Sequence, residues 1–466
     1  MATSGTNSGP ELLVELDRGG SQPLHRQLAD GLREAIRSGR LAPATRMPAT
    51  RVLAADLGVS RRLVVEAYGQ LTAEGFLHTR QGGGTHVAAV APVTPSRAGT
   101  DATRARFDID FAPGSPDLAS FPRQAWLRAM RQGLAETESS TFGYVAPHGL
   151  AATRTAVADY LRRTRGVVAD PRRIVLCSGA TQAIALLARC LDNSVATEDP
   201  GFWPHRMVLR HNGIEPSPIP VDGDGIDVAA LEASGATTIL TTPAHQSPTG
   251  VVLSPARRTA LLHWAQQPGR LIIEDDYDAE YRYDRSPVGA LQGVAPDQVV
   301  YVGSTSKTLA PGLRIGWMVV PDHLIEPVRI AKGLADTGSS VMDQIAFSQF
   351  LTSGGYDRHL RQMRRRYPAR RRALLDALSR HLPLAEVLGA AAGVHLTVRF
   401  PAGFPVDELI RRATARRIRL EPLAPCYADP DTAPPGLILG YANLTESQIA
   451  RGVEKLGEIA RQLPEV

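Results

Sequence analysis

The first 90 residues alternate helical patterns of apolar positions with short glycine or proline breaks. Residues 23–38 carry an apolar side chain at every fourth position, which predicts one face of a helix formed by Leu24, Leu28, Leu32 and Ile36. Pro48 begins a second apolar helical segment, and Gly58 ends it. Ser60 is a favourable N-cap for a third helix, whose buried face would contain Leu63, Val64, Ala67, Tyr68 and Leu71.

Two short strands joined by a glycine-rich tip are predicted next, over residues 74–87. Helices with a glycine turn before the last one, followed by such a β-wing, form the layout of a winged helix-turn-helix. The third helix of this motif presents its N-terminal residues to base edges in the major groove. We therefore expect Arg61 and Arg62 to contact bases, and Arg51 and Arg80 to contact phosphates. An ordinary solvated arginine face is the alternative interpretation.

Residues 39–88 resemble the DNA-binding domain of GntR-type bacterial regulators. The matching motifs are Met47-Pro48-x-x-Arg51, Leu57-Gly58-Val59-Ser60-Arg61, Ala67-Tyr68 and Gly82-x-Gly84-Thr85. The resemblance implies binding to a double-stranded DNA operator through Arg51, Ser60, Arg61, Arg62, Arg80, Gly84 and Thr85. Ala44 departs from the family, which commonly has glycine in the loop between the first two helices.

A change in composition separates this domain, residues 10–88, from the rest of the chain. Residues 89–107 are rich in Ala, Pro, Thr, Ser and Gly and lack periodicity, which is typical of a linker. Fully extended, a segment of this size reaches at most about 70 Å. That reach is sufficient for the DNA-binding domain to cross to a partner subunit.

From residue 108 to residue 466, short apolar strands alternate with helical stretches. Strands are predicted at residues 174–176, 238–240, 271–273, 299–302 and 317–320. Their alternation with helices predicts a doubly wound α/β domain, in which ligands bind at the carboxyl ends of the strands. We expect a large subdomain over about residues 134–335, and a small subdomain built from about residues 108–133 and 336–466.

Side chains that suit a phosphate and an aldehyde follow several of these strands. The chain has three lysines among its 52 basic residues, and Lys307 follows a predicted strand in the motif Gly303-Ser304-Thr305-Ser306-Lys307. Hydroxyls and the nearby Arg314 suit a phosphate, and the amine suits a Schiff base. Asp275 ends another strand, where a carboxylate can pair with a protonated pyridine nitrogen. Each feature alone also fits a turn, a helix cap or a surface charge.

Together and in this order, these groups resemble those of fold-type I aminotransferases, which use pyridoxal 5'-phosphate (PLP). The whole chain is similar to the MocR-type subfamily of GntR-like regulators, in which a winged helix-turn-helix is fused to an aminotransferase-like domain. The resemblance implies PLP as the cofactor, Lys307 as its aldimine lysine and Asp275 as the partner of its pyridine nitrogen. It also implies cofactor contacts from Ala180, Thr181, Phe202, Tyr277, Ser304, Ser306 and Arg314. Tyr144 would reach the cofactor of the neighbouring subunit, which implies a homodimer.

Two positions depart from the pattern of ordinary aminotransferases. Ser247 stands where asparagine often contacts the phenolic oxygen of the cofactor, which leaves Tyr277 to fill that role. Ile438 stands where many such enzymes have an arginine that binds the substrate carboxylate. Either Arg206 or Arg399 supplies that charge instead, or the ligand is of a different kind.

The remaining features exclude several classes of protein. No apolar run approaches the ~18 residues of a membrane span, and no signal peptide is visible, which predicts a cytoplasmic protein. Cys177, Cys190 and Cys426 are too scattered for a disulfide framework or a metal site. Arginines in the helical stretch 356–382 point in nearly all directions, which favours a solvated helix over a second DNA site.

These observations predict a PLP-dependent transcriptional regulator that senses an amine, an amino acid or a vitamin B6-related effector through a Lys307 aldimine. A catalytically active aminotransferase that carries a DNA-binding domain is the alternative. A regulator whose pocket binds no cofactor is a third interpretation, which the presence of Lys307, Asp275 and Arg314 disfavours.

Overall fold

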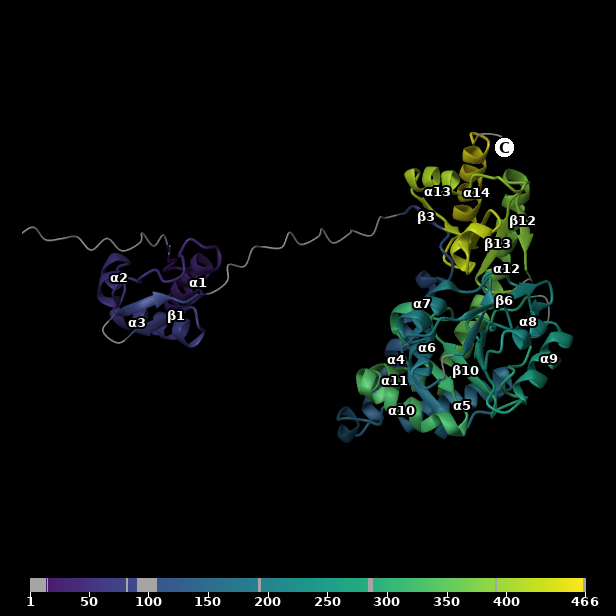
Figure 1. The fold of residues 1–466 in the computed structure, drawn as a ribbon, viewed down its shortest axis with the longest axis horizontal. Coiled ribbons are helices and arrows are strands. Elements are labelled where there is room, and N and C mark those ends of the chain that lie inside the picture. Colours follow the sequence, from purple (N-terminus) through teal and green to yellow (C-terminus); the bar gives the residue numbers. More distant parts are fainter. Residues whose placement is uncertain are drawn as a thin grey trace, which may run out of the picture. The chain divides into compact units, whose positions relative to one another are not determined.

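The computed structural model describes residue 14 and residues 16–80, 83–89, 107–191, 194–283, 288–389 and 392–463. The chain divides into two units between Ala105 and Arg106, and each unit is described separately (Figure 1).

Three helices and a two-stranded wing form the N-terminal unit, as the sequence predicts. Its elements are α1 (Leu24–Arg37), α2 (Thr50–Asp56), α3 (Arg61–Ala73), β1 (Leu77–Arg80) and β2 (Gly84–Val87). The apolar face of α1 is buried against Val64 and Leu71 of α3. The Ser60 side chain accepts a hydrogen bond from the Leu63 amide at 3.3 Å, so it caps α3 as expected. The winged helix-turn-helix is therefore confirmed.

The loop between α1 and α2 keeps a glycine-like conformation at an alanine. Ala44 has a φ of 63°, in the left-handed region that normally favours glycine. Its amide donates a hydrogen bond to the Val87 carbonyl at 2.9 Å, and the Val87 amide donates to Thr45 at the same distance. The loop is thus held against the wing in the shape that glycine would allow without strain.

A mixed sheet in the order β4-β11-β10-β9-β8-β5-β6-β7 forms the centre of the second unit. Its strands are β4 (Ile174–Cys177), β5 (Val195–Asp199), β6 (Ser217–Asp222), β7 (Gly225–Ile226), β8 (Thr238–Thr241), β9 (Leu271–Asp275), β10 (Val299–Ser304) and β11 (Gly316–Val319). The five predicted strands are all present. One of them, β11, runs antiparallel between β10 and β4, because the short connection from β10 leaves no room for a helical crossover.

Helices cover both faces of this sheet, because the apolar residues of the strands point alternately to either side. On one face Val175 and Cys177 pack with α6 (Ala180–Ala188), α7 (Trp203–His211) and α10 (Asp322–Asp336). On the other, Ile174 and Leu176 pack with α5 (Ala151–Arg165), α11 (Val341–Thr352) and α12 (Gly355–His381). Farther along the sheet, the same face is covered by α8 (Val228–Ala233) and α9 (Pro255–Ala265). The α/β architecture predicted from the sequence is confirmed.

A smaller antiparallel sheet lies at one end of this unit, together with α13 and α14 (Figure 1). Its order is β12-β13-β16-β15, and the bounds are β12 (Glu386–Leu388), β13 (His395–Arg399), β15 (Glu421–Pro422), β16 (Gly436–Gly440), α13 (Val406–Ala415) and α14 (Glu446–Ala460). Beside it, β3 (Ile109–Asp110) pairs in parallel with β14 (Ile418–Arg419). The helix α4 (Arg123–Glu136) instead packs on α11.

Short 3-10 helices connect several elements: η1 (Leu118–Ser120), η2 (Ser139–Phe142), η3 (Pro171–Arg173), η4 (Pro311–Leu313), η5 (Ala424–Cys426) and η6 (Pro430–Thr432).

Several arginines of α12 make structural contacts instead of facing solvent alone. Arg364 donates to the Glu280 carbonyl at 2.6 Å. Arg370 pairs with the buried Asp117 carboxylate at 2.7 Å and also donates to the Ala442 carbonyl. The arginine-rich sequence of this helix is thus explained in part by contacts that join it to the rest of the unit, and helical periodicity did not reveal these partners.

Candidate functional site

A cavity of about 400 Å³ lies at the carboxyl ends of β9 and β10, with residues of the smaller sheet on its other side. Most of the residues predicted to hold a cofactor line it, namely Ala180, Thr181, Phe202, Asp275, Tyr277, Ser304, Ser306, Lys307 and Arg314. The side chain of Tyr144 is instead fully exposed and does not line this cavity. The strands thus bring together groups that are more than 130 positions apart in the chain.

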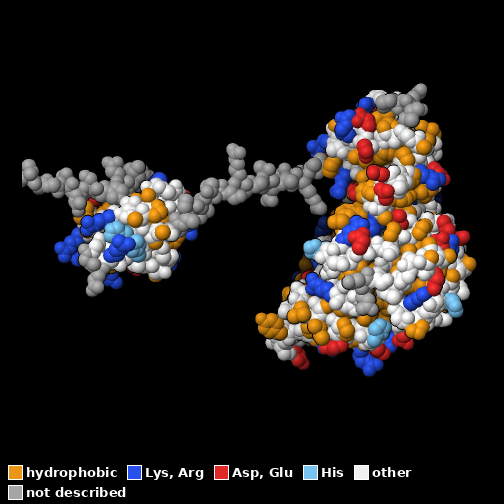
Figure 2. All heavy atoms as spheres, viewed as in Figure 1, with side chains coloured by type: hydrophobic (Ala, Val, Ile, Leu, Met, Phe, Trp, Pro, Cys, Tyr) orange, Lys and Arg blue, Asp and Glu red, His pale blue; other side chains and the backbone are white. Residues whose placement is uncertain are grey.

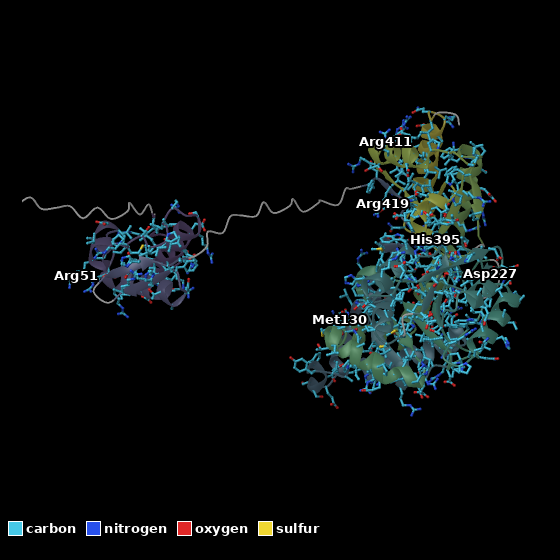
Figure 3. The ribbon with its side chains drawn as sticks, viewed as in Figure 1. Arg51, Met130, Asp227, His395, Arg411 and Arg419 are labelled. Atoms are coloured by element: carbon cyan, nitrogen blue, oxygen red, sulfur yellow. The ribbon has the colours of Figure 1, made fainter. Side chains whose placement is uncertain are left out.

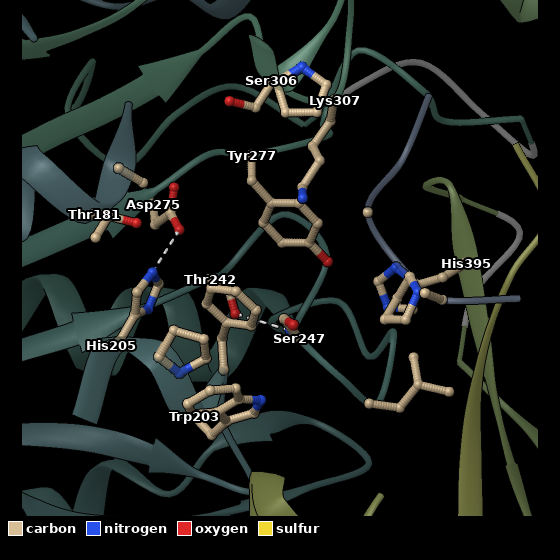
Figure 4. Close-up of a pocket in the computed structure, with 18 of the residues that line it drawn as sticks. Thr181, Trp203, His205, Thr242, Ser247, Asp275, Tyr277, Ser306, Lys307 and His395 are labelled. Atoms are coloured by element: carbon tan, nitrogen blue, oxygen red, sulfur yellow. Dashed lines mark hydrogen bonds and ion pairs between the residues drawn. The ribbon is translucent and has the colours of Figure 1, made fainter. Parts of the chain in front are cut away.

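Lys307 follows β10 and extends its side chain into the cavity (Figure 4). Burial lowers the pKa of its amine, and the nearby carboxylates of Asp278 and Asp275 partly oppose this effect. A methyl group added at Gly114 would lie 2.3 Å from the Lys307 Nζ, so the backbone packs directly against the amine. Gly114 also has a φ of 87°, which a larger residue adopts only with strain.

Asp275, the last residue of β9, is held by a histidine that the sequence analysis did not identify. His205 Nε2 lies 3.3 Å from Asp275 Oδ2, and both side chains are buried (Figure 4). His205 comes three residues after Phe202, and their rings are in contact with centroids 4.9 Å apart. The i, i+3 spacing at the start of α7 was the available signal, because such residues share a helix face.

Donors suited to an anion converge at the end of the cavity nearest α6. Gly179 precedes this helix with a φ of 112°, which leaves the first amides of α6 facing the cavity. A methyl group added at Gly179 would lie 3.8 Å from both the Ser306 hydroxyl and the Arg314 guanidinium. Arg314 makes only a long hydrogen bond, at 3.5 Å to the Pro311 carbonyl, within the part of the chain that the structure describes. This donor set fits a phosphate dianion.

A chain of polar groups extends from Tyr277 toward the smaller sheet. The Tyr277 hydroxyl lies 3.0 Å from His245 Nδ1, which is also 3.0 Å from Asp278 Oδ2. Burial raises the pKa of the Tyr277 phenol well above its usual value, and the neighbouring carboxylates add to the effect. The His395 ring stacks on the Tyr277 ring, with centroids 6.4 Å apart, and lies tilted beside His245 at 5.4 Å. Asp278 and His395 had no predicted role, because only the fold brings them to the cavity.

Neither arginine proposed as a substitute for the carboxylate clamp lines this cavity. Arg206 is buried and donates to the carbonyls of Pro425, Cys426 and Tyr427. Arg399 pairs with Glu386 at 2.6 Å on the outer part of the smaller sheet. Ile438 does line the cavity, so the place of the expected arginine is apolar.

The arginines predicted to contact DNA are exposed on the N-terminal unit. Arg51 on α2, Arg61 and Arg62 at the start of α3, and Arg80 at the end of β1 all face solvent. Figure 3 shows Arg51 projecting outward, and Figure 2 shows basic and histidine side chains gathered on this part of the unit. Ser60 and Gly84 are also exposed and Thr85 is half-buried, whereas Gly82 lies outside the described residues.

One further arginine, Arg46, lies beside the wing and was not identified from the sequence. A methyl group added at Gly84 would be 3.4 Å from its Nε atom. Arg46 also forms an isolated β-bridge with His86. The arginine is therefore held next to Gly84 and Thr85 of the wing, by a contact that joins distant parts of the domain and has no local sequence signal.

None of the described helices is long and apolar enough to cross a membrane. The described histidine, cysteine, aspartate and glutamate side chains form no group that could hold a metal ion.

A winged helix-turn-helix joined to an α/β unit, with a lysine, an aspartate and an anion site in one cavity, defines a regulator built on an aminotransferase-like fold. Residues 24–87 match the family of bacterial regulatory proteins described as the gntR family, and residues 108–456 match aminotransferase class I and II. The chain belongs to the MocR-type subfamily of GntR-like transcriptional regulators.

Similar proteins share both parts of the chain. The probable rhizopine catabolism regulatory protein MocR of Rhizobium meliloti is 33% identical over 473 residues, which cover 95% of each protein. The pyridoxine biosynthesis transcriptional regulator PdxR of Corynebacterium glutamicum is 30% identical over 91% of this chain and 93% of its own length. Kynurenine aminotransferase of Pyrococcus horikoshii, solved with PMP, has a TM-score of 0.71 and 26% identity, over 77% of this chain and 92% of that one. The second unit therefore has the fold of PLP aminotransferases.

Proposed function

We propose that this protein is a PLP-dependent transcriptional regulator that binds DNA with its N-terminal unit and senses an amine, an amino acid or a vitamin B6-related effector in the cavity at Lys307. The observation that carries this proposal is the convergence of Lys307, the Asp275–His205 pair and the anion site in a single cavity. Because this cavity lies in a chain that also has a GntR-type DNA-binding domain, we assign it the role of sensing an effector. Contact with DNA would place its action in the cytoplasm.

The residues present fit PLP at both ends. Arg314, the hydroxyls of Thr181, Ser304 and Ser306, and the first amides of α6 would hold the phosphate. Asp275, oriented by His205, would pair with the protonated pyridine nitrogen, and Phe202 would stack on the ring. Bound there, PLP supplies an electrophilic carbonyl beside the Lys307 amine, which is the chemistry that recognises a primary amine.

The Tyr277 hydroxyl would donate a hydrogen bond to the phenolic oxygen of the cofactor. Burial keeps this hydroxyl protonated, as its raised pKa indicates. Ser247, at the position where ordinary aminotransferases often have asparagine, lines the same side of the cavity. Tyr277 would therefore provide the principal contact with that oxygen.

A homodimer would complete the site. Tyr144 is fully exposed and lies close in sequence to Phe142, whose side chain is half exposed. Ile330 and Leu334 of α10 are further large apolar side chains exposed on this unit. Exposed apolar side chains of this kind mark interaction surfaces. In the proposed dimer, Tyr144 of the partner subunit contacts the cofactor of this chain.

On the DNA side, Arg61 and Arg62 would read bases, because they lie at the exposed N-terminal end of the recognition helix. Arg51 and Arg80 would contact phosphates on either side of it. Arg46, held next to the wing, would add a further phosphate contact.

A catalytic aminotransferase is the second candidate, because Lys307, Asp275 and Tyr277 are all present in the cavity. An apolar Ile438 in place of the carboxylate-binding arginine argues against efficient turnover of amino acids. Transfer of an amino group to a keto acid at about 1 to 10³ per second would favour the enzyme over the regulator.

The proposal is tested by reconstituting the purified protein with PLP. A visible absorption band is expected in the wild type and in Lys455→Ala, since Lys455 lies on the exposed side of α14, and it should be lost in Lys307→Ala. Binding of the same samples to DNA selected by the protein from a random pool should change when an effector amine is added. A wild-type protein without the band, or DNA binding that no amine or B6 compound alters, would contradict the proposed function.

A further inference from the structure

The wall of the cavity formed by the smaller sheet presents hydrogen-bond acceptors. His395, at the start of β13, lines the cavity and is only 5% exposed. Its Nε2 atom is buried and has no hydrogen-bond partner among the residues that the structure describes. A buried polar atom without a partner costs about 1–3 kcal/mol of folding free energy. An atom of this kind beside a cavity is explained most simply by a ligand that completes its hydrogen bond.

The protonation of His395 determines what kind of ligand atom it can receive. Nε2 is the ring nitrogen that is buried without a partner, and the nearby Pro248 carbonyl accepts a hydrogen bond from the Thr397 hydroxyl at 2.6 Å. Burial lowers the pKa of the ring to about 4, which keeps it neutral at physiological pH. In the neutral tautomer with the proton on Nδ1, Nε2 is a free acceptor.

Glu421 adds a second acceptor to the same wall. It belongs to β15, lines the cavity, and is directly opposite Ile438 in the register with β16. Among the described residues, its carboxylate forms no hydrogen bond and no ion pair. Arg419 lines the cavity as well, and its guanidinium faces the Asp110 carboxylate at 3.8 Å. Glu421 is therefore a carboxylate on this wall that no described residue pairs.

The opposite preference, for a carboxylate, has little support at this wall. Ile438 is apolar where an arginine clamp would stand, and Arg206 and Arg399 are paired elsewhere. Arg419 lines the cavity, but its guanidinium already faces the Asp110 carboxylate. A ligand carboxylate would meet Glu421 with like charge. Hydroxyl and ammonium groups, in contrast, satisfy both acceptors.

We propose that the effector is a primary aliphatic amine whose second polar group is a hydrogen-bond donor, a hydroxyl or an ammonium, and that His395 Nε2 and Glu421 receive that donor. This inference rests on the proposed function, because it assumes that the primary amine is recognised at Lys307. It narrows the effector from amines and amino acids in general to amino alcohols and diamines, and it assigns to His395 and Glu421 the choice between them and amino acids.

The test uses the PLP-loaded full-length protein and matched ligands that differ only at the far end. Diaminobutane, aminobutanol and 4-aminobutanoate, each with its shorter and longer homologues, are titrated by calorimetry and by the change in the visible band. We expect the diamine or the amino alcohol to bind at least about tenfold more tightly than the amino acid of the same length, which corresponds to about 1.4 kcal/mol.

Three variants separate recognition from folding. His395→Phe should lower the affinity for the preferred ligand about fivefold to tenfold, because it removes one hydrogen bond to a buried acceptor. Glu421→Gln should weaken the diamine more than the amino alcohol. Glu386→Gln makes the same change on β12 of the same sheet, at a carboxylate that Arg399 pairs on the outer surface, and should have no effect. Unchanged thermal unfolding of each variant shows that it is folded.

The double variant Glu421→Gln with Ile438→Arg should reverse the preference toward 4-aminobutanoate, because it places a guanidinium on the wall and removes the opposing carboxylate. A wild-type protein that shows the cofactor band but prefers the amino acid, binds none of the ligands, or is unaffected by His395→Phe overturns this inference alone. Absence of the cofactor band overturns the proposed function, and this inference falls with it.

Discussion

His205 Nε2 lies 3.3 Å from Asp275 Oδ2, and the two side chains shield each other from solvent at the end of β9. Asp275 is the residue proposed to pair with the pyridine nitrogen, so His205 acts by positioning this carboxylate. We expect His205→Asn to weaken PLP binding about tenfold, because the carboxylate loses a charge-assisted partner worth roughly 1.5 kcal/mol. PLP retention during dialysis, followed by absorbance, measures this effect.

His211→Asn is the matched control, since His211 lies on the same helix and is exposed. The two variants should unfold at similar temperatures in the absence of PLP. Equal PLP affinity in the His205 variant and the control would show that Asp275 needs no support from His205.

Ala44→Gly should stabilise the DNA-binding domain. The left-handed conformation at this alanine costs about 1–2 kcal/mol, and glycine removes that cost. Glycine also gives the unfolded chain more conformational freedom, which offsets about 0.4–1 kcal/mol of the stabilisation. A net increase of about 0.5–1 kcal/mol in the free energy of unfolding is expected. Ala42→Gly, in the same loop but without a positive φ, should give no increase. Thermal unfolding of the domain compares them, and equal effects would mean that Ala44 is not strained.

The free energy of unfolding should decrease as the pH rises, because Glu280 is a buried carboxyl. Burial raises the pKa of this carboxyl to about 7, and Asp276 adds to the shift. The folded state therefore retains a proton that the unfolded state loses at about pH 4.5. The stabilisation is complete below that pH, declines as the pH rises, and is gone above about pH 7.

Glu280→Gln should remove this part of the pH dependence, because glutamine keeps an acceptor for the Tyr160 hydroxyl, which lies 2.8 Å away, without a charge. Relative to the wild type, the variant should gain on the order of 1–3 kcal/mol between pH 5 and pH 8. Urea unfolding at several pH values measures the difference. If the free energies of unfolding of the two proteins changed with pH in the same way, a group other than Glu280 would be responsible for the pH dependence.

Arg61 and Arg51 should affect DNA binding in different ways. Arg61→Ala should cost about 1–3 kcal/mol on the selected operator and leave binding to random DNA nearly unchanged, because base contacts carry the specificity. Arg51→Ala should weaken binding to the operator and to random DNA alike. It should also reduce the number of counterions released on binding, given by the slope of log affinity against log salt concentration, by about one. Fluorescence anisotropy over a range of salt concentrations distinguishes them. An Arg61 variant that binds both DNAs as the wild type does would remove this residue from the base contacts.

Much of the fold follows from local patterns. The helical face at Leu28 and Leu32, the cap at Ser60 and the apolar strand ending at Asp275 all depend on residues close in sequence, and each of these elements is present. Strand ends meet at one edge of a sheet, so Lys307 and Asp275 were expected to come together, and both line the same cavity.

The features that were missed depend on contacts between distant segments. His395 comes to the cavity on the smaller sheet, and Arg46 lies against the wing only because the domain folds. The antiparallel direction of β11 follows from a short connection that apolar periodicity does not encode. The subdomain bounds, the DNA contacts and the role of Tyr144 stay predictions.

The pairing of β3 with β14 also has a mechanical consequence. The Asp108 amide donates to the Arg417 carbonyl at 2.9 Å and the Phe111 amide to the Arg419 carbonyl at 3.0 Å, so the segment that follows the linker is attached to the strand carrying Arg419. A few residues later the same segment reaches Gly114, against the Lys307 amine. Residues 108–114 thus contact both the strand that carries Arg419 and the amine of Lys307. A ligand that displaced the proposed effector wall would therefore also act on the segment that directly follows the predicted linker.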